Sequence, residues 1–312
     1  MSTKTGTGKY ERLLERCKSL EAIPTAVAYP CEKSALLAAV EAAQAGIIAP
    51  LLVGPADKIA ETAQSADVDT GKLEIVDAPD SVAAAKKAVE LIREGRAEVL
   101  MKGSLHSDEL LSAIVSRDGG LRTGRRISHV FVMDVPTYHK VLVVTDAAIN
   151  IAPTLEDKVD ICQNAIDLAV SLGVERPKLA ILAAVEVVNS KMPATLDAAA
   201  LCKMAERGQI KGAILDGPLA FDNAISKEAA KTKGIQSAVA GDPDILLAPD
   251  LEAGNILAKQ LSFLANADSA GLVLGARVPV ILTSRADSVR SKIASCAVAN
   301  LVAHARRQTT GK

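Results

Sequence analysis

The sequence predicts an α/β protein in which helices pack on mainly parallel β-sheets, divided between two domains. Apolar, β-branched segments alternate with helical patterns along most of the chain. Hydrophobic residues make up 49% of the sequence, yet aromatic residues make up only 2%, so small and β-branched side chains must fill the interior. The length of 312 residues exceeds that of one ordinary core and suits two.

The first part of the chain repeats a strand–helix unit. Gly46 and Gly95 are placed to end two of its helices, Ser81 to cap the start of one, and Ser107 or Asp108 to cap the start of another. Serial units of this kind predict a parallel, doubly wound sheet. Strands are expected at residues 25–30, 47–54, 73–79 and 98–104, and helices at 31–46, 81–95 and 107–116.

The rhythm changes near residue 130, where a domain boundary is expected. Strands at 129–136 and 140–146 are separated by only three residues, too few for a helical crossover, which predicts an antiparallel pair. A helix at 154–173 follows, with Thr154 and Asp157 in capping-box positions. Further strands are expected at 178–185, 212–217 and 244–250, two more within 271–284, and a last helix at 288–306.

Composition excludes several classes of partner. A net charge of −1 provides no general attraction to phosphate backbones or anionic membranes, and few rings are available to stack on bases. No apolar run reaches the length of a membrane span. Five scattered cysteines without a CxxC pair indicate a reducing compartment. We therefore expect a cytoplasmic protein that binds neither nucleic acid nor membrane.

Polar residues follow the strands, at the edge of the sheet where open α/β folds bind ligands. Guanidinium, ammonium and amide groups there favour an anionic, phosphate-bearing substrate. The candidates at strand ends are Lys102, Gly103, Asp146, Asn150, Asp216, Asn255, Ser284, Arg285 and Asp287, and Arg126 and Ser128 stand just before a strand.

Ordinary structural roles are open to most of these residues. Ser284 or Asp287 would serve to cap the last helix, and Asp146 and Asp216 would serve as turn residues. Arg285 fits less easily, because a cap needs no guanidinium. The four histidines lack metal spacing and no HExxH motif is present, so no metal site is predicted. No GxGxxG motif follows a strand and no GxSxG motif is present, so neither a dinucleotide fingerprint nor a nucleophile elbow is predicted.

Six stretches together resemble the phosphate acetyltransferase and phosphate butyryltransferase family. They occur in the family's order and span residues 100 to 288, which makes the resemblance more specific than any single motif. Two of them, GLRTGRRISHV and TSRADS, are most similar to the butyryltransferase branch and to the domain fused to enoyl-CoA hydratase in some bacteria. The stretches are LMKGSLHS, GLRTGRRISHVFVMD, VTDAAINIAP, LDGPLAFDNAIS, DILLAPDLEAGNILAKQL and VPVILTSRADS.

The resemblance implies two three-layer α/β domains with a cleft between them, similar to the isocitrate dehydrogenase-like fold. Residues 1–135 with 269–312 would form the first domain and residues 136–268 the second. The family is commonly dimeric, which implies a homodimer.

The resemblance also implies reversible transfer of a short acyl group, acetyl, propionyl or butyryl, between coenzyme A and inorganic phosphate. The thiolate would attack the acyl phosphate directly, without a cofactor. Arg285 would bind phosphate, Ser284 would donate its hydroxyl, and Ser128 with an arginine of the 122–126 group would lie across from them. The other implied substrate contacts are Lys102, Gly103, Arg126, Asp146, Asn150, Asp216 and Asn255.

The proton acceptor for the thiol is open. Ser291 stands where acetyltransferase members have an acidic residue, and the nearest carboxylate is Asp287, so the base is either Asp287 or absent. Two other functions remain as alternatives: a metal- and NAD-dependent decarboxylating dehydrogenase of the same fold, and a catalytically silent acyl-CoA-binding protein.

Overall fold

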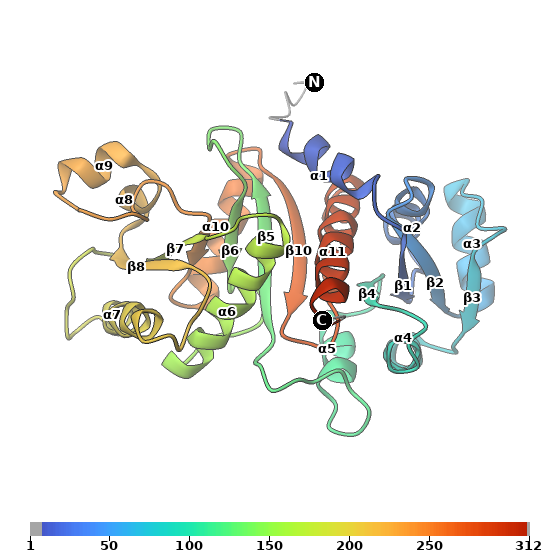
Figure 1. Ribbon diagram of the computed structural model, residues 1–312. Coiled ribbons are helices and arrows are strands. Elements are labelled where there is room, and N and C mark those ends of the chain that lie inside the picture. The colour runs from blue at the N-terminus through green and yellow to red at the C-terminus, as the bar shows by residue number, and fades with distance from the viewer. Residues whose placement is uncertain (1–7, 311–312) are drawn as a thin grey trace. The chain divides into compact units, whose positions relative to one another are not determined.

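The computed structural model describes residues 8–310, which form two compact units (Figure 1). Unit 1 comprises Gly8, Lys9 and Arg126–Ser269, and unit 2 comprises residues 10–125 and 270–310. Residues 126–135 thus pack with unit 1, whereas the sequence placed them in the first domain. The domain ranges predicted from the sequence, 1–135 with 269–312 and 136–268, stay a prediction.

Unit 2 contains a mainly parallel sheet whose strand order is β3-β2-β1-β4-β11-β10. The pairs along this order are parallel except the last, in which β10 and β11 are antiparallel. The parallel units predicted for the first part of the chain are confirmed. The strands are β1 (Ile23–Ala28), β2 (Ile48–Gly54), β3 (Glu74–Asp77), β4 (Val99–Lys102), β10 (Asp268–Leu274) and β11 (Val280–Ile281).

Two groups of helices cover the sheet of unit 2. α2 (Lys33–Gln44) contacts α3 (Ala56–Ala66) and α11 (Val289–Thr310), whereas α4 (Ser81–Arg93) contacts α5 (Ser107–Val115). The chain moves outward from β1 to β3 and returns to β4. Right-handed crossovers therefore place the α2–α3 group and the α4–α5 group on opposite faces. α1 (Lys9–Cys17) precedes β1.

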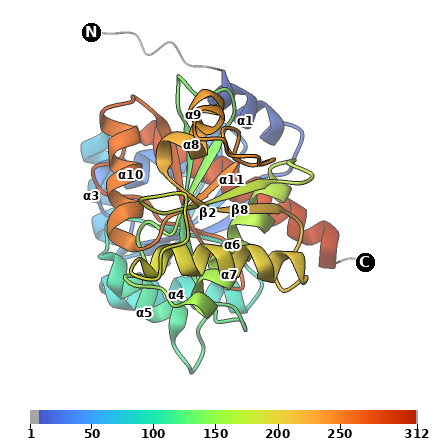
Figure 2. The same cartoon turned by 90° about the vertical axis from the view of Figure 1, so that its left-hand side faces the viewer.

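Unit 1 is built on the strand order β5-β6-β9-β7-β8. The predicted hairpin is confirmed: β5 (Ser128–Asp134) and β6 (Leu142–Thr145) are antiparallel, and the remaining pairs are parallel. Two of its helices, α6 (Leu155–Ser171) and α7 (Pro193–Glu206), lie side by side (Figure 2). The other elements are β7 (Lys178–Leu182), β8 (Ile214–Leu219), β9 (Ile245–Leu247), α8 (Phe221–Ile225), α9 (Lys227–Thr232) and α10 (Leu251–Phe263).

Small and β-branched side chains form the interiors, as the composition predicts, and the α/β class is confirmed. In unit 1, Val144 of β6, Leu246 of β9 and Ala180 of β7 belong to one apolar cluster with the hairpin residues Met133 and Leu142. In unit 2 the middle of α11, from Cys296 to Ala299, is fully buried. Because small side chains dominate these contacts, strand ends and helices approach closely.

The helix starts show where local signals are sufficient and where they are not. α6 has the predicted capping box of Thr154 and Asp157. The cap of α4 was predicted wrongly: Asp80 accepts a hydrogen bond from the N–H of Ala83, and Ser81 is the first helical residue. Asp80 and Ser81 are adjacent, and both residue types are common N-caps, so the sequence does not distinguish them. The structure does, because Asp80 has an extended backbone and Ser81 a helical one.

Candidate active site

The loop after β11 is closed on itself by hydrogen bonds. Asp287 Oδ2 accepts from the backbone N–H of Ser284 at 2.7 Å, and Ser284 Oγ accepts from the N–H of Ala286 at 3.3 Å. Neither residue caps the last helix. That role belongs to Ser288, whose Oγ accepts from the N–H of Ser291 at 3.2 Å. Asp287 therefore shapes the turn that presents Ser284 and Arg285, both of which are exposed.

Arg285 extends from this turn toward α5. Its Nη2 lies 3.4 Å from Nδ1 of His106, the residue that precedes α5. Within residues 8–310 no carboxylate forms an ion pair with the Arg285 guanidinium. An exposed guanidinium without a carboxylate partner retains its full capacity for a bidentate anion.

Two buried lysines lie behind the turn. Lys292, on the first turn of α11, is 3% exposed and donates to the carbonyl oxygens of Ser284 at 3.3 Å and Asp287 at 2.6 Å. Lys102, at the carboxyl end of β4, is 4% exposed, and no described residue forms a hydrogen bond or ion pair with its ammonium. β4 and β11 are paired neighbours, with Met101 opposite Ile281, which brings Lys102 to the base of the Ser284 turn.

Burial lowers the pKa of both lysines. For Lys102, the positive charges of Arg285 and Lys292 lower the pKa further, and the carboxylates of Glu32 and Asp287 oppose the shift. For Lys292, Asp287 and Glu32 likewise oppose the effect of burial. The two lysines and Arg285 thus crowd together at the ends of β4 and β11, where Arg285 and Lys292 each disfavour the charged form of Lys102.

Gly103 has a steric role beside Lys102. A Cβ at Gly103 would lie 2.4 Å from the carbonyl oxygens of Ala28 and Tyr29, which is far inside van der Waals contact. Its N–H donates to the carbonyl of Ala28 at 2.8 Å, and the hydroxyl of Ser104 donates to that of Tyr29 at 2.9 Å. Glycine at this position allows the ends of β1 and β4 to meet and sets the position of Lys102.

In unit 1 the loop after β6 is organised by Asp146, which is 2% exposed. Its carboxylate accepts backbone N–H bonds from Ala148, Ile149 and Asn150, and a further bond from the side-chain amide of Asn150. Asn255 on α10 holds the same loop by donating to the carbonyl of Ala147 at 3.0 Å. Asp146 and Asn255 therefore act on the loop backbone.

Arg126 is held on two sides by this part of unit 1. Its Nε donates to Oδ1 of Asn150 at 2.6 Å, and its Nη1 lies 3.1 Å from Oδ1 of Asp157. The side chain is still half exposed. A guanidinium anchored in this way keeps donors free for an anion while its orientation is restricted.

Ser128 and Asp216 are placed differently. The Ser128 hydroxyl is fully buried and accepts from Nδ2 of Asn164 at 2.9 Å, which ties β5 to α6. Asp216 lies on β8, separated from β6 by β9 and β7, and its Oδ1 accepts from the N–H of Gly217. The structure therefore joins Arg126, Asp146, Asn150 and Asn255 in one cluster but leaves Asp216 apart.

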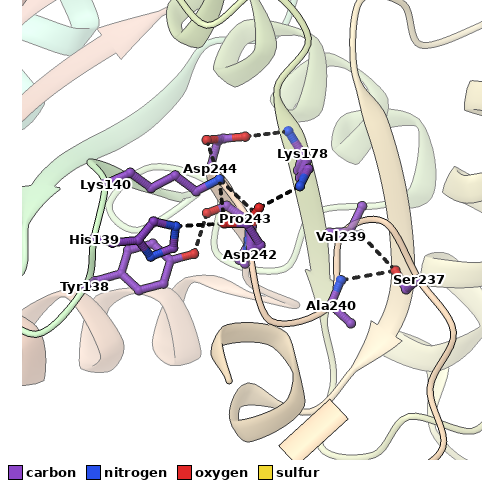
Figure 3. A network of polar contacts seen from close by, with 10 residues as sticks. All are labelled: Tyr138, His139, Lys140, Lys178, Ser237, Val239, Ala240, Asp242, Pro243 and Asp244. Atoms are coloured by element: carbon purple, nitrogen blue, oxygen red, sulfur yellow. Dashed lines mark hydrogen bonds and ion pairs between the residues drawn. The ribbon is translucent and has the colours of Figure 1, made fainter. Parts of the chain in front are cut away.

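Sequence reasoning missed a second charged cluster in unit 1 (Figure 3). Asp242, just before β9, contacts Nζ of Lys178 at 2.6 Å, Nζ of Lys140 at 3.2 Å and Nε2 of His139 at 2.8 Å. Lys140 also lies 2.9 Å from Asp244. Burial would raise the pKa of Asp242, but hydrogen bonds from Lys178 and Lys140 outweigh that effect and hold this pKa well below its usual range. This Asp242 network ties the β5–β6 hairpin to the strand neighbouring it.

The structure also bears on membrane and metal binding. Across residues 8–310, every helix is too short or too polar to cross a lipid bilayer. The same residues include no group of three or more His, Cys, Asp or Glu side chains arranged to hold a metal ion.

Known proteins resemble this chain closely. A family model described as "Phosphate acetyl/butaryl transferase" matches residues 81–300. A phosphate acetyltransferase of Rhizobium meliloti is 61% identical over 96% of this chain and 95% of its own length. A phosphate butyryltransferase of Clostridium acetobutylicum is 43% identical over 94% of this chain and 98% of its own. A branched-chain phosphotransacylase from Enterococcus faecalis, solved as a crystal structure, has a TM-score of 0.80 at 31% identity, covering 90% of this chain and 99% of that one.

Proposed function

Because the chain belongs to the phosphate acetyl/butyryl transferase family, we propose that it transfers a short acyl group reversibly between coenzyme A and inorganic phosphate. The observation that supports this chemistry best is that the Arg285 guanidinium and the Lys102 amine stand at the ends of β4 and β11 without a carboxylate partner among the described residues. Acetyl is the first acyl group to test, since identity to the Rhizobium meliloti acetyltransferase is higher than to the Clostridium butyryltransferase.

In the direction of thioester synthesis, the thiolate of coenzyme A attacks the carbonyl carbon of the acyl phosphate, and the carbon–oxygen bond to phosphate breaks. Arg285 binds the phosphoryl oxygens, where its planar fork matches two oxygens at once. Ser284 donates its hydroxyl to the carbonyl oxygen, on which negative charge develops. No covalent acyl-enzyme is formed in this scheme.

Asp287 and Arg126 are assigned supporting roles, one in orienting the turn and one in binding anions. Asp287 holds the N–H of Ser284 and so orients the turn that carries Ser284 and Arg285. Arg126, anchored by Asn150 and Asp157, contributes a second anion-binding guanidinium for the phosphate groups of the substrates. Coenzyme A and phosphate act as substrates, and no separate cofactor takes part.

The test is phosphate-dependent release of free thiol from acetyl-, propionyl- and butyryl-CoA, before and after dialysis against a chelator. We expect release that requires phosphate and survives dialysis. Absence of release with all three thioesters would rule out the transferase and leave a silent acyl-CoA-binding protein. Loss of release on dialysis would rule out cofactor-free transfer. The dehydrogenase alternative is not favoured, because the related proteins are acyltransferases.

We further propose that the protein is a homodimer formed through α10. Ile256, Phe263 and Leu264 are 66%, 74% and 77% exposed, and their spacing places them along one side of this helix. Ile151, 75% exposed, lies next to the start of α10 through the bond from Leu251 N–H to its carbonyl. A second copy would bury these side chains.

Light scattering after size exclusion tests this arrangement. The wild type should have the mass of two chains, and Ile256→Glu with Phe263→Glu should have the mass of one. A monomeric wild type would contradict the proposal. We also propose a cytoplasmic location, supported by five free cysteines, which cell fractionation would check.

A further inference from the structure

Lys102 is a largely buried amine for which the described protein supplies no partner. It is 4% exposed, and neither a hydrogen bond nor an ion pair to another described residue satisfies it. Lys292 on α11 is equally buried, at 3% exposed, but its ammonium donates to two carbonyl oxygens. The Lys102 Nζ is not among the enclosed polar atoms without a partner, such as Asn223 Oδ1 and Asn300 Oδ1, so the amine remains open to solvent and to a bound substrate. Loss of most of the surrounding water disfavours its charged form unless an anion binds beside it.

Four charged groups from three segments act on Lys102. Arg285 in the loop after β11 and Lys292 on α11 oppose its protonation, whereas Glu32 before α2 and Asp287 favour it. His106 before α5 contacts Arg285. Burial is the largest influence and also opposes protonation, so the pKa of Lys102 is lowered overall. An amine whose pKa is lowered gives up its proton more readily than an ordinary lysine, which suits general acid–base work.

We propose that Lys102 is the proton carrier of the acyl transfer: its neutral amine accepts the proton of the coenzyme A thiol, and the resulting ammonium returns that proton to the departing phosphate. This inference rests on the proposed transferase function and assigns the residue that accepts the thiol proton in that reaction. Asp287 is less well placed for that role, because one of its carboxylate oxygens already accepts the Ser284 N–H.

The step balances without any further reactant. The S–H bond of coenzyme A breaks, the proton joins the Lys102 amine, and the thiolate forms the new carbon–sulfur bond. The carbon–oxygen bond of the acyl phosphate dianion then breaks, and its electron pair leaves with phosphate as a trianion. Lys102 transfers its proton to that oxygen, which yields hydrogen phosphate and restores the neutral amine.

The same residue also explains why phosphate would leave the site protonated. A trianion next to Arg285 and Lys102 is a much stronger base than hydrogen phosphate and takes the nearest available proton. In the reverse direction, Lys102 removes a proton from bound hydrogen phosphate and thereby makes it a better nucleophile toward the thioester.

The experiment compares Lys102→Arg, Lys102→Ala and the wild type in phosphate-dependent thiol release. Arginine keeps a cation but does not give up its proton. Lys102→Arg should therefore bind phosphate, by calorimetry, within about threefold of the wild type while kcat falls by about 10²–10⁴. Lys102→Ala should regain activity when methylamine or ethylamine is added, in proportion to amine concentration.

The pH profile gives an independent readout. The kcat of the wild type in thioester synthesis should rise with pH through the pKa of Lys102, below that of an ordinary lysine. In Lys102→Arg the rise should instead follow the thiol itself, at about 8.5. Lys72→Ala, which removes an exposed lysine before β3, is the matched control. Added amine should not change its kcat, and its pH profile should match that of the wild type.

The outcomes separate the two proposals. An inactive wild type would contradict the transferase function itself. An active wild type with a nearly wild-type Lys102→Arg, or with no amine rescue of a folded Lys102→Ala, would overturn the role of Lys102. Circular dichroism and thermal unfolding establish whether each variant is folded. If Lys102→Ala does not fold, its failure to respond to added amine has no bearing on the role of Lys102, and the result for Lys102→Arg decides.

Discussion

Two charged regions of this molecule are built in opposite ways. In the Asp242 network of unit 1, every lysine has a carboxylate within ion-pair distance, and the cluster joins a hairpin to a neighbouring strand. In unit 2, Lys102 and Arg285 stand at two strand ends without an ion pair to any described carboxylate. Paired charge contributes to stability, whereas unpaired charge is available for a substrate.

The comparison predicts that changes in the unit 2 cluster reduce activity and that changes in the Asp242 network reduce stability. Apart from the Lys102 variants, Arg285→Lys should have the largest effect, because lysine keeps the charge but loses the bidentate fork. Loss of one strong contact, about 2–4 kcal/mol, corresponds to a roughly 30- to 1000-fold lower kcat/KM in the thiol-release assay.

The matched control is Arg290→Lys, which alters an arginine on α11 that pairs with Glu11 at 3.0 Å. It should retain nearly full activity. If Arg285→Lys stays within threefold of the wild type, Arg285 does not bind the transferring phosphate.

Asp242→Asn should reduce stability with little change in activity. The variant loses its negative charge among Lys140, Lys178 and His139, and we expect a loss of about 1–3 kcal/mol in the free energy of unfolding at pH 7. Urea titration measures the loss, and Asp222→Asn, in an exposed pair with Lys233, should cost less. A large fall in kcat in a folded Asp242→Asn would contradict the structural role.

The same network predicts a dependence on acid. The folded-state pKa of Asp242 lies below its value in the unfolded chain, so its contribution to stability is complete above about pH 4, near the unfolded value. The contribution is lost as pH falls through the folded-state pKa. The difference in unfolding free energy between wild type and Asp242→Asn should therefore shrink below pH 4, and a constant difference would disagree with the lowered pKa.

A smaller effect is expected from Asp157→Asn in unit 1. The asparagine can still accept the Thr154 N–H of the capping box, but it no longer forms the ion pair with Arg126. Since Arg126 is half exposed, solvent screens the pair, and about 0.2–1 kcal/mol, or a less than tenfold rise in KM, is expected. Glu156→Gln removes the same charge from the same turn and should leave KM unchanged.

The smallest effect is expected from Asp287→Asn. Asparagine can still accept the Ser284 N–H, so the turn is retained and kcat should stay within about threefold at neutral pH if Lys102 carries the proton. A fall of about 10²–10⁴ that diminishes above the pKa of the thiol would assign the base to Asp287 and contradict the role of Lys102.

The local signals in the sequence predicted elements better than they predicted side-chain roles. The alternation of strands and helices, the β5–β6 hairpin and the capping box of Thr154 and Asp157 are confirmed. Each depends on residues close in the chain, where spacing and turn length decide the backbone. The start of α4 was wrong by one residue, because adjacent Asp80 and Ser81 carry equivalent capping signals.

By itself, the sequence determined the α/β class, the family motifs and the strand ends at which polar residues gather. Tertiary structure decided which of those side chains are accessible and which are satisfied. Ser128 is buried against Asn164, Asp146 is fully engaged by loop amides, and Ser288 rather than Ser284 or Asp287 caps α11. Lys102 stands without a partner because the neighbours that meet it come from segments almost 200 residues apart, and no local pattern records whether such segments supply a donor, an acceptor or another positive charge.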